Sequence, residues 1–98
     1  MIKIWFYNKD GSKDCLEYPQ GLFTVGRDNR SDFCIPLATV SSKHATLSHI
    51  GGKWLLSDLE STNGTLVNGE VIERKFLNHG DKIHFGGFSC WIESKSTS

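Results

Sequence analysis

The segment Glu60-Ser61-Thr62-Asn63-Gly64-Thr65-Leu66-Val67-Asn68-Gly69 places an Asn-Gly pair at each end of the stretch 65–67. Asn-Gly suits the positive φ angles of a type I′ turn. The segment therefore predicts a short strand with a tight turn at each end. Its hydroxyl and amide side chains exceed what two turns require, so we also expect it to supply hydrogen bonds to an anionic group, from Ser61, Thr62, Asn63 and Thr65.

The rest of the chain continues this pattern of short strands and turns, with almost no helical periodicity. Ten glycines mark corners, and Gly51-Gly52 predicts a hairpin turn. Alternating or short apolar runs predict strands over 2–7, 14–18, 22–25, 34–37, 45–50, 53–58, 65–67, 71–72, 82–85 and 89–94. We therefore predict an all-β fold, an antiparallel sandwich or barrel, with its binding loops clustered at one end.

Length and charge limit the functional classes. The chain has 98 residues, with 11 Lys and Arg against 11 Asp and Glu. We expect one domain over residues 1–94, followed by a polar end over 95–98. A net charge of zero gives no general attraction to nucleic acid or to a membrane surface, so any anion site must be local. No apolar run reaches the roughly 20 residues of a membrane span, and we expect a cytoplasmic protein.

Cysteine and histidine usage points away from disulfides and metals. Cys15, Cys34 and Cys90 are odd in number and far apart, so we predict buried free thiols. The histidines show no metal-ligand spacing with each other or with the cysteines. We therefore expect no metal site and no cofactor.

Three polar loops stand out, over residues 26–33, 38–43 and 60–64. The first contains Arg27, whose planar guanidinium fits a phosphate or a carboxylate. A surface ion pair with Asp28 or Asp32 explains Arg27 equally well from sequence alone.

The second loop leads into Ser41-Ser42-Lys43-His44. An enzyme using Ser41 or His44 is the weakest interpretation, because no strand-turn-helix context or activated base accompanies them. We favour hydroxyl groups that bind an anion, and a His44 that braces the loops through hydrogen bonds.

Four motifs together resemble the forkhead-associated (FHA) domain family over nearly the whole chain. Each is weak alone, but their order and spacing make a strong signal. They are Gly26-Arg27, Ser41-x-x-His44, Ser61-Thr62-Asn63-Gly64-Thr65 with Val67-Asn68-Gly69, and Leu77-x-x-Gly80-Asp81-x-Ile83-x-x-Gly86.

The resemblance implies a non-catalytic, eleven-stranded β-sandwich whose loops bind a phosphothreonine-containing protein or peptide. Arg27 and Ser41 would contact the phosphate, with Ser42 beside them. Thr62 would donate from its hydroxyl or main-chain N–H, and Asn63 would bind the peptide main chain. The family's architectural positions would be Gly26, His44, Gly64, Asn68 and Gly69.

One position departs from the family pattern. The family often has a basic residue where this chain has Ser42, so a second cation at the phosphate is missing. Strand alternation is expected to point Lys43 away from its neighbour. We therefore expect reversible binding in the micromolar range, weaker or more salt-sensitive than with two cations.

A second interpretation is a phosphate-independent interaction or self-association domain that uses a sheet face. Exposure of Trp5, Tyr7 or Trp91 in one patch would favour it. The simpler expectation is that the tryptophans, including Trp54, are core or partly buried packing residues. We expect a monomer or part of a longer polypeptide.

Overall fold

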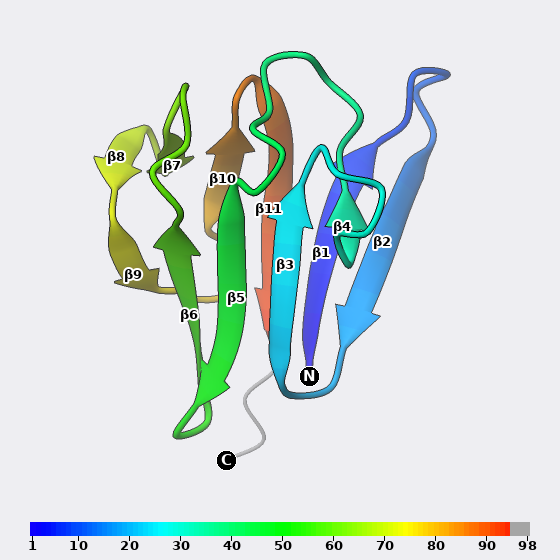
Figure 1. Cartoon of the computed structure of the whole chain (residues 1–98). Coiled ribbons are helices and arrows are strands. Elements are labelled where there is room, and N and C mark those ends of the chain that lie inside the picture. Colours follow the sequence, from blue (N-terminus) through cyan, green and yellow to red (C-terminus); the bar gives the residue numbers. More distant parts are fainter. Residues whose placement is uncertain (95–98) are drawn as a thin grey trace.

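The computed structural model describes residues 1–94, which form two stacked sheets and no helix (Figure 1). No described residue therefore belongs to a helix able to cross a membrane. The strands are β1 (Ile2–Tyr7), β2 (Lys13–Tyr18), β3 (Leu22–Gly26), β4 (Phe33–Cys34), β5 (Ala45–Ile50), β6 (Lys53–Asp58), β7 (Thr65–Val67), β8 (Glu70–Ile72), β9 (Arg74–Phe76), β10 (Lys82–Phe85) and β11 (Phe88–Ser94).

The strands divide between a six-stranded sheet, in the order β2-β1-β11-β10-β7-β8, and a five-stranded sheet, in the order β4-β3-β5-β6-β9. Every pairing is antiparallel except β3 with β4. The predicted all-β antiparallel sandwich of eleven strands is confirmed.

The core lies between the sheets because alternate side chains of each strand point inward. On β1, Ile2 and Ile4 are buried while Lys3 and Trp5 are partly exposed. On β5, Ala45 and Leu47 are buried in the same way. Each fully buried large side chain contributes about 1.5–3 kcal/mol. The largest fully buried side chains include Phe85, Ile35, Leu56, Ile83, Ile92, Val25, Val40 and Val67.

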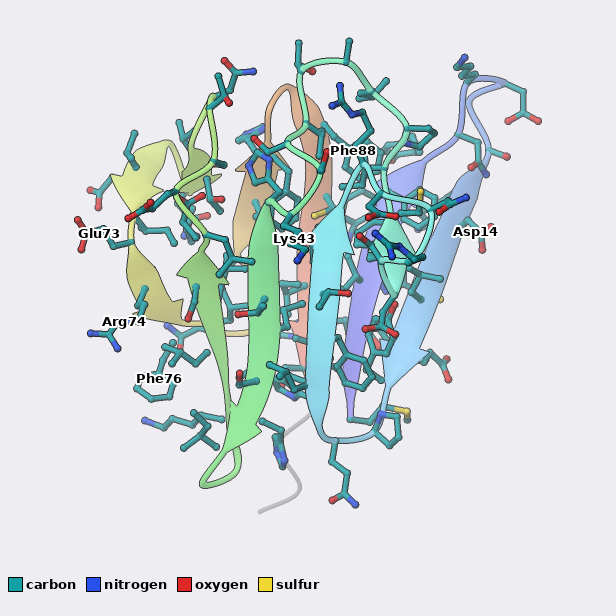
Figure 2. All side chains as sticks on the ribbon, in the orientation of Figure 1. Asp14, Lys43, Glu73, Arg74, Phe76 and Phe88 are labelled. Carbon is teal, nitrogen blue, oxygen red and sulfur yellow. The ribbon has the colours of Figure 1, made fainter. Side chains whose placement is uncertain are left out.

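Two strands differ from the sequence-based prediction. The strand expected over 34–37 is only Phe33–Cys34, because Pro36 has no N–H to continue a ladder. Strand β9 was not expected. Its neighbour Glu73 and its own Arg74 and Phe76 are exposed at the sheet edge, so the sequence lacks an alternating apolar pattern (Figure 2).

The two Asn-Gly pairs form different turns. Asn68 and Gly69 have φ angles of 52° and 86°, as the predicted type I′ turn requires. At the other pair only Gly64 has a positive φ, of 82°, so the type I′ prediction is wrong there. The Asn63 side chain instead reaches across to another loop, as described below.

The tryptophan prediction is confirmed, and the thiol prediction is partly corrected. Trp54 is buried in the core, and Trp5 and Trp91 are partly buried on the solvent side of the six-stranded sheet. The three cysteines are free, yet only Cys90 is buried. Cys34 is exposed because its short edge strand turns the side chain away from the core.

The polar loops gather at one end of the sandwich, at the top of Figure 1. The connections after β3, after β4 and after β6 all lie there, whereas the N-terminus and the β5–β6 turn lie at the opposite end. The three loops singled out from sequence are therefore neighbours in space. The sheets fix where each loop begins and ends.

Candidate functional site

Backbone hydrogen bonds tie the first two loops together. The Arg27 N–H donates to the Ser41 carbonyl over 2.9 Å, and the Asp28 N–H donates to the Ser42 carbonyl over 3.2 Å. This approach depends on Gly26, because a Cβ there would collide with the Ser42 carbonyl group. Gly26 therefore fixes the distance between Arg27 and Ser41.

His44 connects the second and third loops from a fully buried position. Its Nδ1 accepts from the Ser41 N–H over 3.1 Å, so Nε2 must carry the proton and donate to the Gly64 carbonyl over 2.9 Å. The ring meets Phe85 edge-on, at 5.6 Å between centroids. His44 is thus a brace between loops, as the sequence predicted, and both its nitrogens are used.

Side chains complete the connection between the loops. The Thr62 N–H donates to the Ser41 hydroxyl over 2.9 Å, and the Asn63 amide nitrogen donates to the Thr39 carbonyl over 2.7 Å. The second contact fixes the orientation of the Asn63 amide, because a carbonyl only accepts. Ser41, Thr62 and Asn63 are therefore positioned before any ligand arrives.

Asp58 holds the base of the third loop. Its Oδ1 accepts from the Ser61 hydroxyl over 2.6 Å and from the Thr65 hydroxyl over 2.7 Å, and its Oδ2 accepts from the Ser61 N–H over 3.2 Å. Burial raises the pKa of Asp58, but the hydrogen bonds from Ser61 and Thr65 outweigh it, so the pKa lies below its usual value.

Asp58→Asn is expected to lower the free energy of unfolding by about 1–3 kcal/mol at neutral pH, because an amide oxygen replaces the charged acceptor. The folded-state pKa of Asp58 is depressed, so this stabilisation is present above the unfolded pKa, about 3.9. This stabilisation is lost as the pH falls through the pKa of Asp58 in the folded state.

Urea denaturation of the wild type and Asp58→Asn at neutral pH and at the acid end of the folded range measures this difference. Glu73→Gln, which removes an exposed carboxylate at a sheet edge, serves as the control. A stability gap between wild type and Asp58→Asn that stays constant at acid pH would contradict the prediction.

The guanidinium of Arg27 has no carboxylate partner among residues 1–94. Asp28 pairs with Arg30 over 2.9 Å, and Asp32 accepts from the backbone and hydroxyl of Thr24. Hydrogen bonds from Arg30 lower the pKa of Asp28 to about 2. The sequence allowed a surface ion pair of Arg27 with Asp28 or Asp32 as the alternative to anion binding. In the structure it is Arg30 that pairs with Asp28. The Arg27 side chain is exposed, and within residues 1–94 its guanidinium makes one long contact, 3.5 Å, with the Ala38 carbonyl.

Ser42 and Lys43 lie at the edge of this constellation. The Ser42 side chain is exposed beside Ser41, while Lys43 lies at the upper ends of β3 and β5 in Figure 2. There it lines a separate depression of about 390 Å³ with Asp28, Arg30 and Thr24. Lys43 thus points to the outer side of the five-stranded sheet.

The proposed architectural residues divide into two groups. Gly26, His44 and Gly64 lie within the loop cluster. Asn68 and Gly69 lie at the other end of β7, where Asn68 bonds to Asp81 over 3.0 Å and to the Lys82 N–H over 3.0 Å. These two residues join β7 to β10 and do not touch the loops.

Sequence reasoning missed Asp58 and Thr39. An Asp at a strand end three residues before Ser61 has the spacing of a side-chain-bridged turn, which was an available signal. The carbonyl of Thr39 carries no sequence signal, because any residue supplies one.

A model of the FHA domain matches residues 23–86, which include every loop described above. The chain belongs to the FHA domain family. Solved FHA domains share its fold. One, from a structural and functional analysis of phosphothreonine-dependent FHA domain interactions, is 29% identical with a TM-score of 0.83. The match covers 96% of each chain. The FhaA FHA domain, solved in complex with the intracellular domain of Rv3910, is 30% identical with a TM-score of 0.86, covering 95% of this chain and 100% of that one.

Curated relatives place FHA domains within larger proteins. The chain is 39% identical over 70 residues to the ABC transporter ATP-binding/permease protein Rv1747 of Mycobacterium tuberculosis, covering 71% of this chain and 8% of that protein. It is 36% identical over 78 residues to the glycogen accumulation regulator GarA of Mycolicibacterium smegmatis, covering 80% of this chain and 48% of GarA. The chain thus spans about half or less of these relatives.

Proposed function

We propose that this FHA domain recognises phosphothreonine-containing segments of partner proteins through Arg27, Ser41, Ser42, Thr62 and Asn63. The observation that carries the proposal is the guanidinium of Arg27, which pairs with no carboxylate in the described part of the chain and lies in the loop that is bonded to Ser41. An exposed arginine with unused donors beside preorganised hydroxyl groups is a site for a phosphate.

The remaining donors follow from the existing hydrogen bonds. Because the Ser41 hydroxyl oxygen accepts from the Thr62 N–H, its own proton is available to a phosphate oxygen. The Thr62 N–H is already used, so the Thr62 hydroxyl is the group left to donate. Asn63 uses one N–H on Thr39, which leaves its carbonyl oxygen to accept from a peptide N–H.

The charge balance fits a phosphothreonine, which carries about −1.5 to −2 charges and three strong acceptor oxygens. One guanidinium and two or three neutral hydroxyl donors meet those oxygens without a strongly basic surface. The comparisons support this ligand class, because a similar FHA domain is described by its phosphothreonine-dependent interactions.

The hydrogen bonds of His44 support a non-catalytic role. Both its ring nitrogens are bonded to backbone groups, and it meets the N–H of Ser41 rather than the hydroxyl. It therefore has no free nitrogen to take a proton from Ser41, as nucleophilic catalysis requires.

We propose that this domain acts in the cytoplasm and that residues 1–94 form one recognition unit. Three free thiols, one of them exposed, suit a reducing compartment. A common core between the two sheets supports one folding unit. Its relatives are longer, so we place the domain within a larger polypeptide.

Titration calorimetry with a degenerate phosphothreonine peptide library, against the same library without phosphate, tests the function. We expect a dissociation constant in the micromolar range, roughly −8 kcal/mol, for the phosphorylated peptides. No heat of binding is expected from the unphosphorylated set, since Arg27 then has no anion to bind. Equal binding of both sets would reject phosphate recognition.

A further inference from the structure

The solvent side of the six-stranded sheet carries aromatic residues where an antiparallel sheet usually presents polar ones. Trp5 lies opposite Trp91 across β1 and β11, and Tyr7 packs on Trp91 at 5.3 Å between ring centroids. Tyr7 is 62% exposed, and the two tryptophans are partly exposed. We call Trp5, Tyr7 and Trp91 the aromatic face.

The aromatic face is incompletely covered by the described part of the chain. Lys13 folds over it, with its Nζ 5.0 Å from the Trp5 ring centre and 6.0 Å from that of Trp91. Beside Trp91 lies a depression of about 550 Å³, lined also by Tyr7, Lys82 and His84. The Lys13 stem covers part of this apolar surface, and its charge lies over the rings.

Charge is distributed unevenly along the strands of this face. Register places Lys13 level with Tyr7 at the loop end, and Glu17 level with Lys3 at the other end. Lys3 pairs with Glu17 over 3.4 Å and with Glu93 over 3.8 Å, which leaves that end with one net negative charge. Within residues 1–94, Lys13 pairs with no carboxylate. The aromatic face thus lies between a positive end and a negative end.

We propose that the aromatic face binds a second copy of this chain, with the strands of the two copies antiparallel. A twofold axis between the sheets, running across the strands at the level of Trp5 and Trp91, stacks each of these tryptophans on its own copy and places Tyr7 over Lys3 of the other copy. On β2, Lys13 and Glu17 lie two residues on either side of Cys15, which is level with Trp5. The axis therefore places Lys13 of each copy over Glu17 of the other.

The charges of Lys13 and Glu17 favour this arrangement. With the strands of the two copies parallel, Lys13 and Glu17 lie at opposite ends of the stacked sheets and do not meet. The antiparallel axis also places Lys82, which is level with Trp91, over its own copy, and the two Lys13–Glu17 contacts outnumber this one like-charge contact. The antiparallel arrangement forms two equivalent Lys13–Glu17 contacts and covers the tryptophans from solvent. It also leaves both loop clusters free, because they extend beyond opposite ends of the paired sheets. Self-association is thus independent of the proposed phosphate site.

Sedimentation equilibrium of the 98-residue chain without peptide, from low to high micromolar concentration, tests the proposal. We expect a reversible monomer–dimer equilibrium. Lys13→Glu and Glu17→Lys should each raise the dimer dissociation constant about tenfold or more, because each creates two like-charge contacts. The double variant Lys13→Glu/Glu17→Lys should return it close to the wild-type value, because the pairs are restored with reversed sign.

Lys53→Glu is the matched control. Lys53 also lies over an aromatic ring, with Nζ 6.0 Å from the centre of Phe76, but it is on the five-stranded sheet. Reversing the charge of Lys53 should leave the dimer dissociation constant unchanged. A chain that stays monomeric throughout, or a dimer whose double variant shows no recovery, would overturn the proposal. Circular dichroism of each variant separates loss of association from loss of fold.

Discussion

Arg27→Ala is expected to weaken phosphothreonine-peptide binding at least about a hundredfold, which is near 3 kcal/mol. The physical reason is that Arg27 is the sole guanidinium in the cluster without a carboxylate partner, so no other described cation replaces it at the phosphate. Calorimetry with one phosphothreonine peptide measures the loss. Arg27→Lys keeps the charge but not the planar fork, so it should fall between the wild type and Arg27→Ala.

Arg30→Ala is the control for that experiment, since it removes a guanidinium from the same loop. Arg30 is bonded to Asp28, and its side chain is 85% exposed. We expect a change in affinity of less than about threefold. If Arg30→Ala loses as much binding as Arg27→Ala, the phosphate contact does not belong to Arg27 alone and the prediction is wrong.

His44→Ala is expected to have the largest effect on stability, lowering the free energy of unfolding by about 3–5 kcal/mol. The change leaves a cavity beside Phe85 and removes the partners of the Ser41 N–H and the Gly64 carbonyl. For a domain of this size, that loss lowers the melting temperature by more than about 10 °C. Thermal and urea unfolding followed by tryptophan fluorescence measure it.

His79→Ala is the companion variant, because His79 is exposed and, within the described residues 1–94, its side chain accepts only from the Ser94 N–H. It should change the free energy of unfolding by less than about 1 kcal/mol. If the two histidine variants melt at similar temperatures, the loops are held together without His44.

The sandwich was predictable because its strands obey local rules. Ile2, Ile4 and Phe6 alternate with outward residues, and Gly51-Gly52 has the chemistry of a tight hairpin. Strand β9 was not predictable, because an edge strand with Arg74 and an exposed Phe76 is stabilised by pairing with β6 rather than by its own pattern. The solvent-side position of Trp5 and Trp91 depends on which strand face the core occupies. Neighbouring apolar residues occur on both faces here, so composition alone left a core position and a partly buried position open.

The loop cluster was predictable in its residues and less so in its contacts. The motifs marked Arg27, Ser41, Thr62 and Asn63, and the structure brings their loops together at one end of the sandwich. The pairing of arginines with acidic residues depended on loop geometry. Arg30 pairs with Asp28 because the Arg30 N–H already donates to that carboxylate and brings the two side chains together.

The cross-loop hydrogen bonds have a consequence for how this domain passes on a signal. Ser41, His44, Thr62 and Asn63 are linked through the protein before any peptide arrives, so binding requires little ordering of the loops. Loops that are already linked leave little change of shape through which the domain could report occupancy. We therefore propose that its output is proximity: a polypeptide joined to the domain is kept beside a phosphorylated protein, at a high local concentration, for as long as the phosphate remains.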